Sequence, residues 1–378
     1  MNVNSVSVYM GQRLVGELAE TPSHRYAFAY SETWLKKGFN ISPFSLPLEK
    51  KVFVPEKLHF NGLFGIFEDS LPDSWGRLLV DRMLASKGFD PSQVSPLQRL
   101  CIVGDSGMGA LNYKPNWRIA QSREIDSLDE ISRACQDLLL KRETPELDAL
   151  FAFGGSSGGA RPKVITDEWI IKFPASAEDR NAGCMEKEYM DSAAQCGIEV
   201  LETKLFASNT CAGYFGSKRF DRVRRSDGSV QRKYMATVAA LLEHDWRVPS
   251  LDYHTLMKLT KIICADNKAV IEQMYRRMCF NVFAHNRDDH AKNFSFIIDE
   301  CKRTWQPSPA YDLTYSNTYY GEHTTSVNGN SKDPSLDDLM AVGTKAGLSR
   351  NVCRSIALEI ASQTSKLVAK YKNSLPGA

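Results

Sequence analysis

The chain has 378 residues, of which 43% are hydrophobic, and its 47 Lys and Arg residues nearly balance its 45 Asp and Glu residues. This length predicts two or three compact units, each with its own core. The formal charge of +2 excludes a global basic field that would make nucleic acid or a membrane surface the main partner. No apolar stretch approaches the length of a bilayer span and residues 1–7 lack the features of a signal peptide, so we expect a cytoplasmic protein.

The nine cysteines are scattered, and no two stand in CxxC spacing. This distribution argues against a zinc knuckle or a disulfide framework.

The first part of the chain, residues 1–115, is predicted to be rich in β-strands. Residues 3–18 alternate around Gly11-Gln12, which is typical of a hairpin. A helix is expected to open at Pro72-Asp73, and a strand is expected at 110–113. The glycines between 104 and 109 lack a following lysine and are interpreted as a turn.

Residues 116–145 form an expected connector, because Ile131, Cys135, Leu138 and Leu139 recur at helical spacing within 126–141. Residues 146–245 are expected to contain a glycine-rich loop at 154–159, a strand at 169–173, a helix at 186–196 and strands at 199–206 and 214–220. Residues 246–378 are predicted to be mostly helical.

The most informative segment is HNRDDHAKNFSF, which covers residues 285–296. A helix with Met274, Met278 and Val282 on one face should deliver this polar loop, and an apolar strand should follow it. Phosphoryl transfer needs one carboxylate to orient the attacking hydroxyl and an amide oxygen a few residues later to bind Mg²⁺. Asp288 and Asn293 have this spacing.

A second metal ligand is expected from Asp312, which should follow a strand, because Mg²⁺ prefers hard oxygen ligands. Two other interpretations of the acidic residues stay open. The Asp-Asp-His turn can be a solvated loop, or Asp288, Asp289, His290 and Asp312 can belong to a hydrolytic metal site. The absence of HxH and HExxH spacing disfavours the second of these.

The glycine-rich segment FGGSSGGARPKV covers residues 153–164. Its glycines allow main-chain N–H groups to converge on phosphate oxygens, although no Gly-Lys-Ser/Thr closes it as in a Walker A loop; the alternative is a flexible loop. Lys172 lies in an apolar strand and therefore requires an anionic partner. That partner is a nucleotide phosphate, or Glu186 or Glu188 on the next helix, and kinases commonly use both arrangements together.

Taken together, these motifs resemble the HipA family of bacterial toxin kinases over nearly the whole chain. The segments that carry the resemblance are FNVFAHNRDDHAKNFSFI, PSPAYDLTYS, GGSSGGARPKV, WIIKFP and SKRFDR, with SVNGN and the first-part segments GQRLVGEL, FSLPL, FEDSLPDSWGR and GDSGMGAL in support. The resemblance implies an α+β, protein-kinase-like bilobal fold with a β-rich N-terminal subdomain, a kinase N-lobe-like region at 146–245 and a helical C-lobe at 246–378.

The resemblance also implies roles for individual residues. Asp288 would be the catalytic carboxylate, Asn293 and Asp312 the Mg²⁺ ligands, and Ser156, or alternatively Ser157, the site of autophosphorylation. The expected ATP-binding residues are Gly158, Gly159, Ala160, Arg161, Pro162, Lys163, Lys172, Lys218, Arg219, Phe220, His290, Lys292, Asn293, Tyr311 and Asp312.

The function implied is an ATP- and Mg²⁺-dependent protein serine/threonine kinase that acts on a cytosolic protein; known family targets include aminoacyl-tRNA synthetases. A HipB-like helix-turn-helix antitoxin is the implied partner, with DNA contacted only through it and no membrane contact. Two features depart from many relatives: His285 replaces a helix-ending glycine, and the segment after Arg222 lacks a His-Glu-Asp-type motif. The alternatives are a small-molecule phosphotransferase of kinase-like fold and an inactive binding module of an antitoxin–DNA complex.

Overall fold

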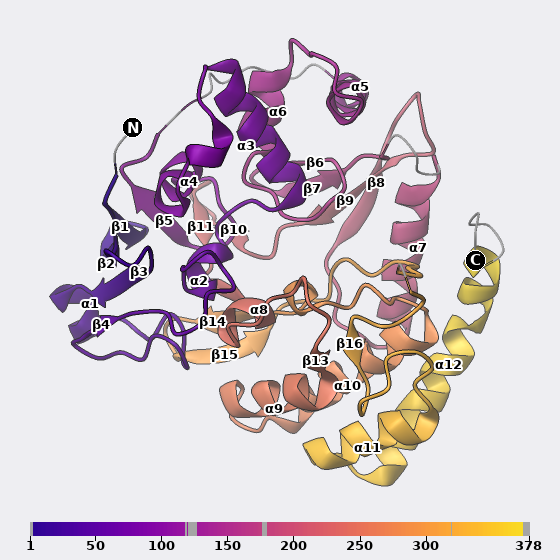
Figure 1. The fold of residues 1–378 in the computed structure, drawn as a ribbon. Coiled ribbons are helices and arrows are strands. Elements are labelled where there is room, and N and C mark those ends of the chain that lie inside the picture. Colours follow the sequence, from indigo (N-terminus) through magenta and orange to yellow (C-terminus); the bar gives the residue numbers. More distant parts are fainter. Residues whose placement is uncertain (1–2, 118, 120–126, 176–179, 319, 373–378) are drawn as a thin grey trace. The chain divides into compact units, whose positions relative to one another are not determined.

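The computed structural model describes residues 3–117, 119, 127–175, 180–318 and 320–372 (Figure 1). Met1 and Asn2 lie outside these ranges. So does Asp126, the residue at which the connector helix was expected to begin. The chain divides into two compact units. The first comprises residues 1–183 and 205–245, and the second comprises residues 184–204 and 246–378.

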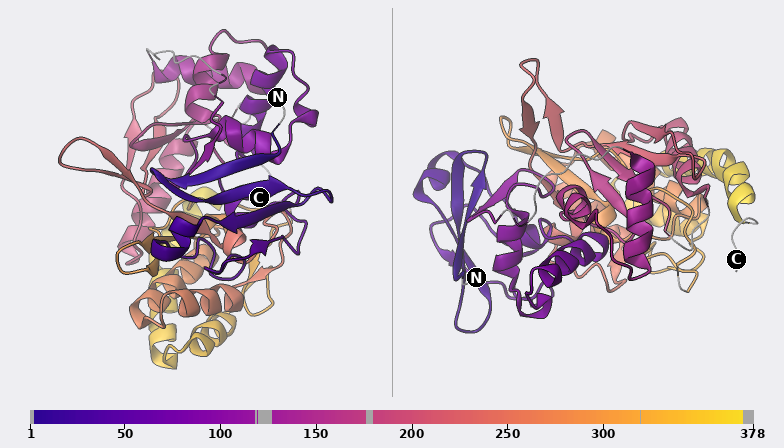
Figure 2. Two further views of the ribbon diagram at one scale, coloured as in Figure 1. Left: turned by 90° about the vertical axis from the view of Figure 1, so that its left-hand side faces the viewer. Right: turned by 90° about the horizontal axis from the view of Figure 1, so that it is seen from above.

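The first unit opens with an antiparallel sheet whose strand order is β4-β3-β2-β1-β5, and its first strands are seen as indigo arrows in Figure 2. Its strands are β1 (Ser5–Met10), β2 (Arg13–Glu20), β3 (Tyr26–Tyr30), β4 (Val52–Phe53) and β5 (Leu111–Lys114). The predicted hairpin is confirmed as β1 and β2, joined at Gly11, whose φ of +59° suits a residue without Cβ. Alternate residues of β1, such as Val6 and Val8, are fully buried.

Several helices of the first unit begin at a capping residue. Ser95 forms a capping box with Gln98, and Pro96 occupies the first turn. The helix expected after Pro72-Asp73 is confirmed. The helices are α1 (Glu32–Lys37), α2 (Gly65–Glu68), α3 (Ser74–Ser86), α4 (Pro96–Val103), α5 (Leu128–Leu139), α6 (Leu147–Gly154), α8 (Val238–Leu241) and the 3₁₀ turn η1 (Pro91–Gln93).

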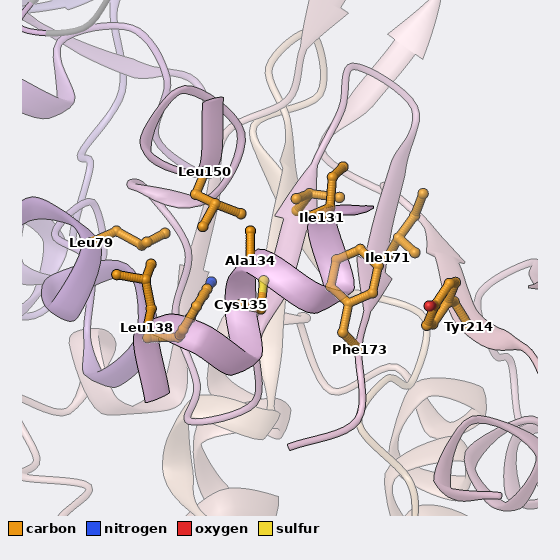
Figure 3. Close-up of a cluster of buried hydrophobic side chains, with 11 residues drawn as sticks. Leu79, Ile131, Ala134, Cys135, Leu138, Leu150, Ile171, Phe173 and Tyr214 are labelled. Carbon is orange, nitrogen blue, oxygen red and sulfur yellow. The ribbon is translucent and has the colours of Figure 1, made fainter. Parts of the chain in front are cut away.

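A second sheet has the strand order β6-β7-β9-β8, with β6 (Lys163–Ile165), β7 (Trp169–Lys172), β8 (Thr203–Phe206) and β9 (Tyr214–Lys218). A hairpin of β10 (Arg222–Arg224) and β11 (Val230–Arg232) and the short β12 (Met235–Thr237) follow. Figure 3 shows the buried cluster that joins this sheet to α3, α5 and α6. Its labelled members include Leu79, Cys135, Leu138, Leu150, Ile171 and Phe173.

The second unit is mostly helical, as expected. It contains α7 (Ala182–Gln195, whose first two residues belong to the first unit), α9 (Tyr253–Ile263), α10 (Lys268–Phe283), α11 (Leu336–Ala346) and α12 (Arg350–Lys372). Its short elements are β13 (Leu251–Asp252), parallel to β16 (Thr325–Ser326), the antiparallel pair β14 (Ser295–Asp299) and β15 (Thr304–Pro307), and the 3₁₀ turn η2 (Ala291–Asn293). Met274 and Met278 of α10 are buried, as their spacing predicted.

The predicted α+β class is confirmed, but two local expectations were wrong. The glycine-rich loop begins one residue late, because α6 continues through Gly154. The strand expected directly before Asp312 is absent: β15 ends at Pro307, and Ala310 makes only an isolated bridge with Val200. In the described ranges no helix is long and apolar enough to cross a membrane.

Candidate active site

The loop that follows α10 carries the predicted catalytic carboxylate. His285 ends the helix with a φ of +53°, a conformation that glycine adopts more easily, and its ring stacks on Tyr315 with centroids 6.0 Å apart. Burial first, and Arg287 second, lower the pKa of His285. Of residues 281–298, all of which the structure describes, only Asp288 is exposed. The loop thus presents one carboxylate to solvent from an otherwise covered segment.

Asn293 is oriented by the same loop. Its amide nitrogen donates a 2.7 Å hydrogen bond to the main-chain oxygen of Asp288. This bond leaves Oδ1 as the amide atom that can accept or coordinate, since an amide has one acceptor oxygen. The structure therefore brings Asn293 and Asp288 together. Their amide and carboxylate oxygens are the kind of ligand that a hard cation such as Mg²⁺ prefers.

The segment around Asp312 is joined to this loop on both sides. On one side, Tyr311 donates from its hydroxyl to the main-chain oxygen of Lys292, at 2.7 Å. On the other side, the N–H of Ser316 donates to the main-chain oxygen of His285, at 3.0 Å. Asp312 lies between these attachments with a φ of +57°, a strained value for a residue with a side chain.

Because no regular strand holds the segment before Asp312, a buried arginine has a role that the sequence did not indicate. Arg277, on α10, is only 4% exposed and donates to the main-chain oxygen of Ser308. Burial lowers the pKa of this guanidinium to about 10. The main chain before Asp312 is thereby attached to the core helix by a side chain instead of a strand ladder.

The second residue of the Asp-Asp doublet has a different environment from the first. Asp289 is fully buried, and its carboxylate accepts hydrogen bonds from the Tyr253 hydroxyl (2.8 Å) and the Thr325 N–H (3.1 Å). Nδ1 of His323 lies 3.2 Å from the same carboxylate. Burial first, and Asp289 second, raise the pKa of Tyr253 well above its ordinary value. Asp289 therefore anchors the loop from inside.

This anchor was not predicted from the sequence. The hydrogen-bond network around Asp289 continues inward. Asn281 donates to the Tyr253 hydroxyl at 2.9 Å, and Asn286 donates to Asn281 at 2.9 Å. The signal in the sequence was the doublet itself, together with Asn281 near the apolar end of α10.

His290 and Lys292, both predicted to contact nucleotide, lie around Trp246 in the second unit. The rings of His290 and Trp246 are 5.3 Å apart, and Nζ of Lys292 lies 5.1 Å from the centre of the indole. Nε2 of His290 is 3.9 Å from the Asp288 carboxylate. No pattern in the sequence indicated that Trp246 supports these two side chains.

In the first unit, the glycine-rich loop passes over the start of α3. The Asp73 carboxylate accepts a hydrogen bond from the N–H of Gly159, whose φ of +79° requires glycine. A Cβ on Gly76 of α3 would lie 2.2 Å from the main-chain oxygen of Ser157. One N–H of the predicted phosphate loop thus already binds an oxyanion, the Asp73 carboxylate. This contact fits the loop for phosphate oxygens, but Asp73 would compete with phosphate for the Gly159 N–H.

The two serines of the loop differ in access. Ser157 is fully buried, and its hydroxyl donates to the main-chain oxygen of Gly154 at 2.6 Å. Ser156 is half-buried, and its hydroxyl donates to the main-chain oxygen of Ser106 at 3.0 Å. The turn predicted at residues 104–109 therefore reaches the glycine-rich loop.

Lys163 and Lys172 are paired directly across β6 and β7, so their side chains lie on one face of the sheet. They are only 6% and 8% exposed. Lys163 donates to the main-chain oxygen of Gly158, and Nζ of Lys172 lies 5.6 Å from the Phe215 ring centre. The pairing places two cations next to each other on this face, which suits it to a polyphosphate.

Of the acids weighed as partners for Lys172, Glu188 is engaged within its own unit. Its carboxylate accepts from Lys370 at 2.6 and 2.7 Å and from the hydroxyl of Tyr371 at 2.8 Å. Glu186 on the same helix is 1% exposed.

The expected ATP-binding residues Lys218, Arg219 and Phe220 lie at the end of β9 and directly after it. Lys218 lies 3.6 Å from Glu168 and is half exposed. Arg219 turns inward: its guanidinium makes two hydrogen bonds to buried Asp221, at 2.9 and 2.8 Å. Burial alone would raise the pKa of Asp221, but Arg219 and Arg222 hold it below its ordinary value. The Arg219 side chain is thus used in the core.

The remaining loop residues vary in exposure. Gly158 and Ala160 are exposed, Arg161 is half-buried and Pro162 is buried. The structure thus groups 156–163 with Lys172 in the first unit, and Asp288, Asn293 and Asp312 in the second.

Within the described residues, no three His, Cys, Asp or Glu side chains are grouped to hold a metal ion. A hydrolytic centre with an all-protein ligand set therefore lacks its ligands in this part of the chain. Magnesium bound with a nucleotide needs only one or two carboxylates, because phosphates and water complete its shell. Asn293 and Asp312 suit that smaller set.

Residues 6–114 match the HipA N-terminal domain, and residues 155–368 match the HipA-like C-terminal domain. The chain belongs to the HipA family. HipA of Shewanella oneidensis MR-1, solved with HipB and operator DNA, is similar with a TM-score of 0.73 and 19% identity, over 99% of this chain and 92% of that one. Y4mE of Sinorhizobium fredii (strain NBRC 101917 / NGR234), whose name describes a candidate kinase, is 25% identical over 84% of this chain and 79% of its own length.

Proposed function

We propose that this HipA-family protein is an ATP- and Mg²⁺-dependent protein serine/threonine kinase. The observation that carries the proposal is the presentation of Asp288: it is the one exposed residue of a loop that is otherwise covered, and Asn293 is bonded to its main chain. A kinase catalytic loop needs this arrangement, because the carboxylate must meet an external hydroxyl while a nearby amide oxygen binds the metal.

In this proposal Asn293 and Asp312 hold Mg²⁺, and Lys163, Lys172 and the loop 158–163 bind the ATP phosphates. Bound Mg²⁺ neutralises charge on the phosphates. Asp288 accepts the proton of the attacking hydroxyl or orients that hydroxyl. The family match and the kinase-type name of the Sinorhizobium relative support this assignment.

The loop serine Ser156 is the proposed site of autophosphorylation. Its hydroxyl lies partly in solvent, whereas that of Ser157 is buried and bonded to Gly154. Phosphate on Ser156 adds close to two negative charges to the loop that binds ATP phosphates, so the modified protein should bind ATP poorly. A HipB-like antitoxin, and DNA through it, are the proposed partners, since the structural relative was solved with both.

The experiment is to incubate the wild type, Ser156→Ala, Ser157→Ala and Asp288→Asn with Mg-ATP and to map phosphopeptides by mass spectrometry. Wild type and Ser157→Ala should carry phosphate on residue 156. Asp288→Asn should react at least about 10²-fold more slowly. The variant should still bind ATP, because the wild-type Asp288 carboxylate is expected to face the acceptor hydroxyl and not the nucleotide.

Phosphorylation of an added protein without any modification of the loop would remove the autoregulatory part and leave the kinase. Undiminished transfer by Asp288→Asn would remove the catalytic assignment. Transfer of phosphate to small molecules alone would favour the phosphotransferase alternative, and ATP binding without any transfer would favour an inactive module.

A further inference from the structure

Two consecutive threonines hold the main chain on both sides of Asp288. The main-chain oxygen of Arg287 accepts hydrogen bonds from the N–H of Thr324, at 3.0 Å, and from its hydroxyl, at 2.8 Å. The main-chain oxygen of Asp289 accepts a hydrogen bond from the hydroxyl of Thr325. The peptide group before Asp288 and the peptide group after Asp289 are therefore held by one short stretch of chain.

The side chain of Asp289 adds a third attachment to the same stretch. Its carboxylate accepts the N–H of Thr325 at 3.1 Å and lies 3.2 Å from Nδ1 of His323. Because Asp289 is fully buried, these bonds are shielded from competing water. The carboxylate that precedes it in the sequence, Asp288, makes none of these contacts and remains exposed.

The stretch that holds the loop is itself anchored to other elements. Thr325 and Ser326 form β16, which pairs with β13, and the two strands lie side by side in Figure 1. The Ser326 hydroxyl and the Gly329 N–H both donate to Asp252, at 2.7 and 2.8 Å. A stretch attached in this way can hold the loop instead of following its motion.

We propose that Thr324 and Thr325 are positioning residues for Asp288. Their bonds hold the peptide group before Asp288 and the peptide group after Asp289, so that the short piece of main chain that carries the Asp288 side chain is held at both ends. This inference rests on the proposed function, because it assigns Thr324 and Thr325 a role in phosphoryl transfer. Misplacement of a reacting group by about 1 Å can cost about 10²-fold in rate, so a clamp of this kind would act on turnover.

The decisive variant is Thr325→Val, which keeps the shape of the side chain and removes the hydroxyl bonded to Asp289. Phosphate incorporation at saturating Mg-ATP should fall by about 10- to 100-fold, with an unchanged KM for Mg-ATP. Thr325→Ser restores the hydroxyl and should recover most of the rate. The matched control is Thr364→Val: Thr364 is also fully buried and donates to the main-chain oxygen of Ile360 at 2.8 Å, but it lies on α12.

Thr364→Val should lower stability to a similar extent and leave the rate unchanged. A wild-type rate in Thr325→Val, or equal rate losses in Thr325→Val and Thr364→Val, would overturn the positioning role. A raised KM alone would overturn it as well, because it would assign the threonine to nucleotide binding.

Hydrogen exchange separates failure of this inference from failure of the kinase assignment. The amides of residues 287–290 should exchange faster in Thr325→Val than in Thr364→Val, whether or not the protein transfers phosphate. If wild-type protein shows no transfer but the exchange difference is present, the kinase assignment fails and the clamp stands as a structural device. If the exchange is equal, the clamp itself is refuted.

Discussion

The loop that carries Asp288 is held by buried side chains from several elements, whereas the loop that carries Ser156 is held at the start of α3 by the Asp73 carboxylate and the Trp75 N–H. In the first case the anchor is the fully buried Asp289, bonded to Tyr253 and to Thr325. In the second case the anchor is Asp73, which accepts one N–H of a half-buried glycine.

This difference implies different free energies of local opening. Each buried donor or acceptor left without a partner costs about 1–3 kcal/mol, and several are engaged around Asp289. Half-exposed bonds contribute less, because water replaces them. The catalytic loop is therefore built to stay in place, and the loop with the proposed modification site is built to open at low cost.

The largest expected effect tests the loop that carries Asp288. Asp289→Ala leaves the Tyr253 hydroxyl and the Thr325 N–H buried without their acceptor, and we expect it to destabilise the second unit by about 3–5 kcal/mol. The adjacent Asp288→Ala removes an exposed carboxylate and should change stability by no more than about 0.5 kcal/mol. Urea unfolding followed by hydrogen exchange of peptides from residues 268–299 reports on this unit.

Equal stability of the two alanine variants would contradict the comparison. It would mean that the network around Asp289 is dispensable for the loop.

The next effect concerns the cation. Asp312→Ala removes the only carboxylate of the proposed Mg²⁺ pair, and Mg-ATP affinity should fall at least about 10-fold, since even indirect loss of ligand support costs that much. ATP binding without Mg²⁺ should change little. Asp299→Ala is the control, because Asp299 caps a surface turn at Cys301 in the same unit. Titration calorimetry with and without Mg²⁺ makes the measurement, and an unchanged Mg-ATP affinity would exclude Asp312 as a ligand.

Much of the fold could be predicted from the sequence because its signals are local. The periodicity of Met274 and Met278 indicated the buried helix α10, and the turn at Gly11 indicated the first hairpin. The spacing of Asp288 and Asn293 indicated a loop that the structure indeed builds with the two residues bonded together. Their roles in catalysis remain predictions.

What could not be predicted depends on contacts between distant parts of the sequence. Asp289 and Thr325 are 36 residues apart, and no local pattern shows that a buried carboxylate will meet a threonine there. The strand expected before Asp312 was wrong for a similar reason, because Arg277 attaches that segment to α10 through a side chain. The cross-strand pairing of Lys163 with Lys172 also required the register of β6 and β7.

The smallest expected effect tests the glycine-rich loop that carries Ser156. The Asp73 carboxylate makes no capping bond to α3, so its bond to the Gly159 N–H can be removed with little harm to the helix. Asp73→Ala should therefore favour opening of the glycine-rich loop by about 1 kcal/mol, which corresponds to about fivefold faster hydrogen exchange of the Gly159 amide. The control is Asp90→Ala, since Asp90 accepts the N–H of Ser92 at 2.9 Å in an exposed turn of the same unit and does not contact the loop. Faster exchange in both variants would point to a general loss of stability. Unchanged exchange in Asp73→Ala would show that other contacts hold the glycine-rich loop. The contrast with the loop that carries Asp288 would then be smaller than the structure implies.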